Sequence, residues 1–151
     1  MRLFYFLPLM LISFSLFACS GCKEEHYRPA NPIKESMKLK ITVGGNTFSA
    51  TLNNNETVAA FKAKLPMTID MRDLNGNEKF FDFPENLPAN ASNPGSIQTG
   101  DIMLYGSNTL VLFYKSFPTS YNYTRLGKID NPSGLAAALG SGSVIVTFEI
   151  E

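Results

Sequence analysis

Apolar and polar residues alternate along residues 37–53, and this period of two is the pattern of a β-strand with one buried face. The apolar positions are Leu39, Ile41, Val43, Phe48, Ala50 and Leu52. Gly44 and Gly45 separate the two halves, and glycine readily adopts the positive backbone angles of a tight hairpin turn. The stretch therefore predicts a β-hairpin.

Two short, dense apolar runs, 103–105 and 110–114, flank a Gly-Ser-Asn turn and predict a pair of strands at the centre of the core. Alternation predicts further strands at 67–72, 79–83, 125–129 and 143–151. The dipeptide Asn75-Gly76 predicts a hairpin turn between the first two of these. Residues 84–94 and 116–124 are rich in turn residues or lack a periodic pattern, so both are predicted to be loops.

Two short helices complete the pattern. Val58, Phe61 and Leu65 recur at spacings of three and four, which predicts a helix from Glu56 to about Lys64 with Asn54 or Asn55 as its cap. Residues 132–139 predict a second helix, with a proline at its start and a glycine after its end.

Seven or eight strands with two short helices predict one domain over residues 37–151, and its length suits a single core. Both ends of this domain fall in strands. We expect a closed antiparallel β-barrel of about eight strands, because closure leaves no exposed sheet edge. A β-sandwich is the alternative.

The amino-terminal residues 1–18 carry one early charge, Arg2, followed by an apolar run that is too short for a membrane-spanning helix. This pattern predicts a secretory signal peptide. The run ends in Leu-Phe-Ala-Cys, which resembles the bacterial lipobox, so Cys19 is the predicted lipidation site and Cys22 the second candidate. The alternative is an ordinary signal peptide with two free thiols.

Residues 19–36 contain prolines, charged residues and no apolar period, and we interpret them as a tether. A lipid on Cys19 would hold the domain at a membrane. The Lys-Glu-Glu run at 23–25 resembles the surface-export signal of lipoproteins in the Bacteroides group, although a solvated tether also explains it. The expected location is the bacterial cell envelope, at the outer membrane, facing the periplasm or the surface.

The predicted domain lacks the residue types that several kinds of functional site require. The sequence has one histidine, His26, and two cysteines, and all three precede residue 37, which excludes nucleophilic triads, soft-metal sites and a disulfide framework for the domain. The formal net charge is zero and basic residues are not clustered, so no nucleic-acid partner is expected. No cofactor and no metal are predicted.

Residues 38–151 resemble a bacterial family of minimal cyclophilin-like domains that are often found in exported lipoproteins. The stretches PMTIDMRDLNGNEKFF, GDIMLYGSNTLVLFYKSFPTSYNYTRLGKID and GLAAALGSGSVIVTFEIE carry this resemblance. It implies a cyclophilin-like form of the predicted barrel, and it leaves the activity open.

True cyclophilins are peptidyl-prolyl isomerases whose catalytic strand carries Phe-His-Arg. The nearest match is Asp70-Met71-Arg72, so the resemblance gives Arg72 the catalytic role if the chain is an isomerase, without the preceding histidine. The Gln-Gly-Gly-Asp of isomerases is replaced by residues 79–82, Lys-Phe-Phe-Asp. Aligning Leu-Gly-Lys-Ile at 126–129 with the cyclophilin Phe-Gly-Lys-Val places Tyr123 where isomerases have a pocket histidine.

These observations favour a non-catalytic module that binds a peptide or small molecule. Aromatic walls with a few polar groups suit such a site. The candidate ligand-binding residues are Arg72, Phe80, Tyr105, Phe113, Tyr123 and Arg125. Each also has a purely structural interpretation, as core or as an arginine paired on a wet strand face. The alternatives are a weak prolyl isomerase that uses Arg72 and a structural subunit of an envelope complex. The oligomeric state is left open.

Overall fold

A computed structural model describes residues 37–151 of the chain. The predicted signal peptide, the tether and the lipidation site Cys19 lie outside these described residues. The elements are β1 Lys38–Val43, β2 Asn46–Leu52, α1 Glu56–Lys62, β3 Met67–Leu74, β4 Glu78–Asp82, β5 Ser96–Ile97, β6 Asp101–Tyr105, β7 Thr109–Phe113, β8 Phe117–Pro118, β9 Tyr123–Ile129, α2 Leu135–Leu139 and β10 Val144–Ile150.

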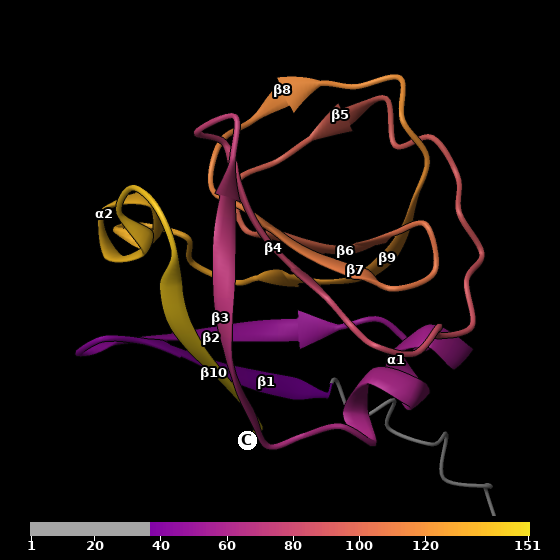
Figure 1. The fold of residues 1–151 in the computed structure, drawn as a ribbon, viewed down its shortest axis with the longest axis horizontal. Helices are drawn as coiled ribbons and strands as arrows, with labels where there is room; N and C mark the ends of the chain where they lie inside the picture. Colours follow the sequence, from indigo (N-terminus) through magenta and orange to yellow (C-terminus); the bar gives the residue numbers. More distant parts are fainter. Residues whose placement is uncertain (1–36) are drawn as a thin grey trace, which may run out of the picture. The chain divides into compact units, whose positions relative to one another are not determined.

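Within residues 37–151, eight strands close into an antiparallel barrel in the order β1-β10-β3-β4-β7-β6-β9-β2 (Figure 1). The first hairpin pairs Ile41 with Phe48, and β1 closes the barrel by pairing Leu39 with Ile150 of β10. The predicted barrel is confirmed, and the alternative of a sandwich is wrong.

Apolar side chains pack on both faces of one part of this barrel. The interior holds the inward residues of the eight barrel strands, together with side chains from both helices. A second, smaller cluster lies on the outer face of β6, β7 and β9, and its buried members are Ile97, Met103, Val111, Phe113 and Tyr123. Strands β5 and β8 pair with each other outside the barrel. In Figure 1 they lie above strands β6, β7 and β9. Strands β6 and β7 are therefore buried on both faces, which explains their unbroken apolar runs.

The two helices lie at opposite ends of the barrel in Figure 1. Asn55 caps α1, because its side-chain oxygen accepts a hydrogen bond of 2.9 Å from the backbone N–H of Val58. The helix ends at Lys62, two residues earlier than expected. The second helix is shorter than predicted and begins at Leu135, since the residues between Pro132 and Gly134 form a turn. No helix among the described residues is long and apolar enough to cross a membrane.

The predicted loops required larger corrections than the predicted strands. The stretch 116–124 contains β8 and the first residues of β9, and β4 begins at Glu78 rather than at Lys79. The stretch 84–94 has no strand, apart from an isolated bridge between Ser92 and Tyr123. These additional pairings depend on partners far away in the sequence, so the local pattern does not indicate them.

Lys79 is fully buried at one end of the barrel interior, and its charge is satisfied there. Its Nζ donates hydrogen bonds to Asp73 Oδ2 at 2.7 Å and to the carbonyl oxygens of Gly140 at 3.0 Å and Gly142 at 2.6 Å. The Tyr114 hydroxyl donates to the same Asp73 oxygen at 2.6 Å. One buried ammonium group thus joins the β3–β4 hairpin to the chain segment that follows α2.

Candidate functional site

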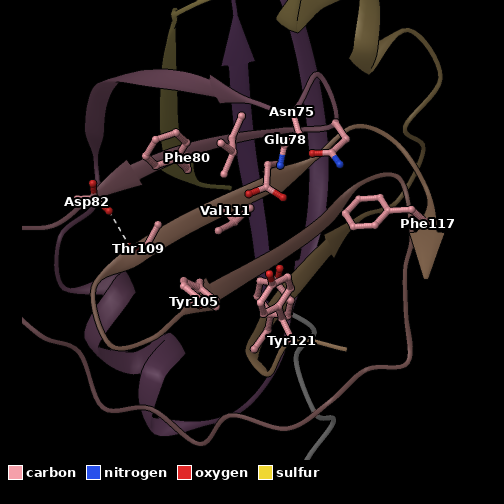
Figure 2. Close-up of a pocket in the computed structure, with 12 residues that line it drawn as sticks. Asn75, Glu78, Phe80, Asp82, Tyr105, Thr109, Val111, Phe117 and Tyr121 are labelled. Carbon is pink, nitrogen blue, oxygen red and sulfur yellow. Dashed lines mark hydrogen bonds between the residues drawn. The ribbon is translucent and has the colours of Figure 1, made fainter. Parts of the chain in front are cut away.

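A groove of about 390 Å³ lies on the outer face of the barrel, over β4, β7 and the adjoining ends of β6 and β9 (Figure 2). We call it the aromatic groove. Its lining residues are Leu74, Asn75, Asn77, Glu78, Phe80, Asp82, Tyr105, Thr109, Val111, Phe117, Tyr121 and Tyr123. Five of these twelve side chains are aromatic, so ring surfaces form most of the apolar lining.

Strand alternation determines which side chains of β4 enter the groove. Glu78, Phe80 and Asp82 point outward into it, because successive residues of a strand face opposite sides. Lys79 and Phe81 point into the barrel interior. The outward residues lie beside β7, where Phe80 pairs with Val111 and Asp82 with Thr109.

Three tyrosines form one side of the groove. Tyr105 and Tyr123 are cross-strand partners on β6 and β9, with ring centroids 5.6 Å apart. Tyr121, from the segment between β8 and β9, packs edge-on against Tyr105 at 6.1 Å. Tyr123 is buried, whereas Tyr105 and Tyr121 are exposed and present ring surface to solvent. Such contacts favour offset or edge-to-face geometry, so the rings hold one another in place.

Glu78 is the buried carboxylate of this groove. The residue is only 9% exposed, and its carboxylate forms no hydrogen bond or ion pair with any residue in the range 37–151. In Figure 2 it lies between Phe80 and Phe117, with Tyr105 and Tyr121 across from it. Burial, and secondarily the negative charge of Asp73, raise the pKa of Glu78 to about 7. The carboxyl group therefore changes its charge near neutral pH.

A second polar atom beside Glu78 also lacks a partner. Asn77 lies in the turn between β3 and β4, and its side-chain Oδ1 is buried without a hydrogen bond to any described residue. Most buried polar atoms in folded proteins have a partner, so one without a partner calls for an explanation. Asn77 Oδ1 is thus an unused acceptor that is closed from solvent, on the residue that precedes Glu78 in the sequence.

Arg72 lies on β3, near the end of β4 that is opposite to Glu78. Its Nη2 donates a hydrogen bond of 2.6 Å to Asp82 Oδ2, and its guanidinium stacks on Phe80 with Cζ 4.4 Å from the ring centroid. The side chain is 58% exposed, so this ion pair is a surface pair. Arg72 is thus an arginine paired on a wet strand face, and its acidic partner is Asp82.

The six predicted ligand residues do not all meet in one place. Phe80, Tyr105 and Tyr123 line the aromatic groove, and Arg72 lies at its edge. Phe113 is fully buried behind the groove and packs against the rings of Phe117 and Tyr123, so it supports the lining.

Arg125 lines a separate depression of about 360 Å³ with Asp101, Lys128 and polar residues of β2 and the β5 region. It follows Tyr123 by two residues on β9, next to the point where the pairing of β6 and β9 shifts register. The structure therefore does not place Arg125 among the residues of the aromatic groove.

Sequence reasoning missed Glu78, Asn77, Phe117 and Tyr121. Glu78 was detectable in principle, since it precedes Phe80 by two residues and must share its face if β4 begins one residue earlier. Phe117 and Tyr121 come from a stretch predicted to be a loop, and local sequence does not indicate where such a loop lies. Among residues 37–151, no group of three histidine, cysteine or acidic side chains is arranged to hold a metal ion.

A closed eight-stranded antiparallel barrel with two short helices is consistent with the class of cyclophilin-like folds. A family model described as the cyclophilin-like family matches residues 41–149, and the chain belongs to this family. The cyclophilin-like resemblance stated from the sequence is thereby confirmed, and the bacterial lipoprotein part of it stays a prediction.

Among solved structures, the chain is similar to the solution structure of a hypothetical protein from Archaeoglobus fulgidus. The TM-score is 0.53 at 20% sequence identity, and the similarity covers 77% of this chain and 95% of that chain. At this identity the similarity supports the fold alone. No curated protein matches the chain.

Proposed function

We propose that this chain is an exported lipoprotein of the bacterial cell envelope whose cyclophilin-like domain binds a peptide or small ligand without transforming it. The ligand would occupy the aromatic groove. The amino-terminal Leu-Phe-Ala-Cys pattern supports the anchor at Cys19, and the composition of residues 19–36 supports a tether between anchor and domain.

One observation carries the binding role. The aromatic groove combines ring surfaces with the Glu78 carboxylate, which no residue of the described range 37–151 partners, and ligand sites characteristically place a few polar groups in an apolar concave lining. The domain sequence has neither histidine nor cysteine, so the commonest general base and the strongest nucleophile are missing from it.

A prolyl isomerase is the second candidate, and the position of Arg72 favours it. The guanidinium lies on Phe80 at the edge of the groove, where a donor would be close to a bound amide. Twisting a prolyl bond has a barrier of about 20 kcal/mol, and lowering it requires a donor directed at the amide. Against this candidate, the same guanidinium already donates to Asp82 at 2.6 Å.

A coupled protease assay on a prolyl tetrapeptide, with the full chain in detergent micelles, separates the two candidates. We expect the isomerisation rate to stay at the uncatalysed value, because Arg72 is engaged by Asp82. The Arg72→Ala variant should give the same rate. An acceleration that disappears in Arg72→Ala would refute the non-catalytic role and establish the isomerase.

The anchor is tested by labelling cells of a bacterial host with radioactive palmitate while they express the full chain. We expect the wild-type chain and Cys22→Ser to carry label and to fractionate with membranes, whereas Cys19→Ser carries none, because only the lipobox cysteine receives acyl chains. Label that persists in Cys19→Ser and is lost in Cys22→Ser would move the lipidation site to Cys22. Absence of label in all three chains would refute the anchor.

A further inference from the structure

We propose that the aromatic groove selects a protonated primary amine, such as the side chain of a lysine in a peptide, and that Glu78 binds its ammonium group. This inference rests on the proposed binding function, because it names the chemical class of ligand for the same groove. The support for it has four parts: charge, hydrogen-bond donors, ring surfaces and pH.

The first part is the missing positive charge. Glu78 has no cationic partner within 4.0 Å among the described residues. The basic residues of β3 and β4 are Arg72 and Lys79, and both are paired with other acidic residues. Lys79 faces the barrel interior and donates to Asp73 and two carbonyl groups, and Arg72 donates to Asp82. An ionised carboxylate is costly to bury without a partner, so the groove favours a cation supplied from outside.

The second part is the number of donors that the site needs. The two oxygens of the Glu78 carboxylate belong to the groove lining and have no donor from the described part of the chain. A primary ammonium group carries three N–H donors and no acceptor. A quaternary ammonium carries no donor, so it would leave these oxygens without hydrogen bonds. The unused acceptors therefore point to a primary amine.

The third part is the ring surface along the groove. The Tyr105 ring contacts those of Tyr123 and Tyr121, with centroid separations of 5.6 Å and 6.1 Å, and Figure 2 shows Tyr105 and Tyr121 across from Glu78. Aromatic faces attract ammonium groups, and apolar lining such as Val111 favours contact with the methylene groups of a lysine stem. Anionic ligands are repelled by the carboxylate, so the same groove discriminates against phosphate and carboxylate groups.

The fourth part concerns pH. The titratable groups around Glu78 are Asp73 on β3, Tyr114 after β7 and Tyr123 on β9, with Tyr105 and Tyr121 across the groove and the Arg72–Asp82 pair further along β4. Hydrogen bonds from Lys79 and Tyr114 lower the pKa of Asp73, and burial raises the pKa of Tyr114 and of Tyr123, so Asp73, Tyr114 and Tyr123 keep their charge states between pH 5 and 8. Amine binding should therefore follow the ionisation of Glu78 alone.

The test is an NMR chemical-shift titration of the full chain in detergent micelles at pH 8. The probes are acetyl-Gly-Lys-Gly-amide, the same peptide with an Nε-acetylated lysine, and acetyl-Gly-Pro-Gly-amide. We expect the lysyl peptide to shift groove resonances, and we expect Nε-acetylation or Glu78→Gln to weaken its binding by at least about tenfold, since each removes one charge of a buried pair. Below pH 7 the affinity should fall about tenfold per pH unit, because protons compete for Glu78.

Glu85→Gln provides the matched control, since Glu85 is exposed and pairs with Lys64 outside the groove. Its affinity for the lysyl peptide should equal that of the wild type. Equal binding of the lysyl and acetyl-lysyl peptides, or unchanged binding by Glu78→Gln, would overturn the selectivity for amines. Binding of the prolyl peptide alone would also overturn it while leaving the groove as a peptide site. No groove shift with any of the three peptides would overturn the proposed binding function as well.

Discussion

Replacing Lys79 by methionine is expected to lower the free energy of unfolding by about 3 to 4 kcal/mol at pH 7, because it leaves a network of buried acceptors without its donor. The side chain of Lys79 is 0% exposed and that of its partner Asp73 is 21% exposed, so little water reaches the site. The carbonyl groups of Gly140 and Gly142 would each lose their Nζ hydrogen bond. Urea denaturation followed by circular dichroism measures the loss.

The control for Lys79→Met is Lys40→Met, which removes a strand lysine from an ion pair at the surface. Lys40 Nζ lies 2.9 Å from Glu149 Oε2, and the two side chains are 41% and 39% exposed. Surface pairs contribute little, so this variant should lose less than about 1 kcal/mol. Equal losses in the two variants would mean that burial of Lys79 does not strengthen its interactions.

The same network also predicts how stability changes in acid. Hydrogen bonds from Lys79 and Tyr114 lower the pKa of Asp73 below its ordinary 3.8. The folded state therefore binds this proton more weakly than the unfolded chain, and the stabilisation is present above about pH 4 and lost as pH falls through the lowered pKa. Because Lys79 is the largest cause of the shift, the loss in acid should be smaller in Lys79→Met.

The barrel was predictable because most of its strands have one buried face. Leu39, Ile41 and Val43 are buried and alternate with partly exposed residues, so the period of two appears directly in the sequence. The turns at Gly44 and Asn75-Gly76 were also local, since these residues have the positive backbone angles that tight turns use. The strands and turns that define the fold thus depend on short-range information.

The groove was less predictable because long-range contacts assemble it. Phe117 and Tyr121 come from a stretch with no periodic pattern, and β8 consists of two residues that pair with β5 about twenty positions earlier. Lys79 was also beyond a pattern-based prediction, since a lysine in a strand is usually placed on the wet face. Alternation could have placed Glu78 on the face of Phe80, but only the tertiary structure shows that Glu78 and Lys79 are both buried.

Replacing Glu78 by glutamine is expected to stabilise the folded domain by about 2 to 3 kcal/mol at pH 8 and to have little effect at pH 4. A carboxyl group whose pKa rises from 4.5 to about 7 on folding is harder to ionise in the folded state. The difference corresponds to about 3 kcal/mol at a pH above both values. Glutamine has nearly the same shape and carries no charge, so the variant avoids this cost.

The wild-type chain should therefore lose stability as pH rises from about 4.5 to about 7, because the folded state holds the Glu78 proton over this range and the unfolded chain does not. Urea denaturation of wild type and Glu78→Gln across this range measures the effect, with Glu85→Gln as the exposed carboxylate control. Parallel profiles for wild type and Glu78→Gln would contradict the burial of an ionisable Glu78.

A carboxylate that destabilises its own domain at neutral pH is a candidate functional group, since perturbed acids without a structural partner are concentrated at binding and catalytic sites. A bound ammonium group would supply the missing positive charge at Glu78 and remove most of the cost of ionisation. Thermal unfolding at pH 8 with the lysyl peptide should therefore raise the midpoint of the wild type more than that of Glu78→Gln. Equal shifts in both chains would show that the peptide binds without using this charge.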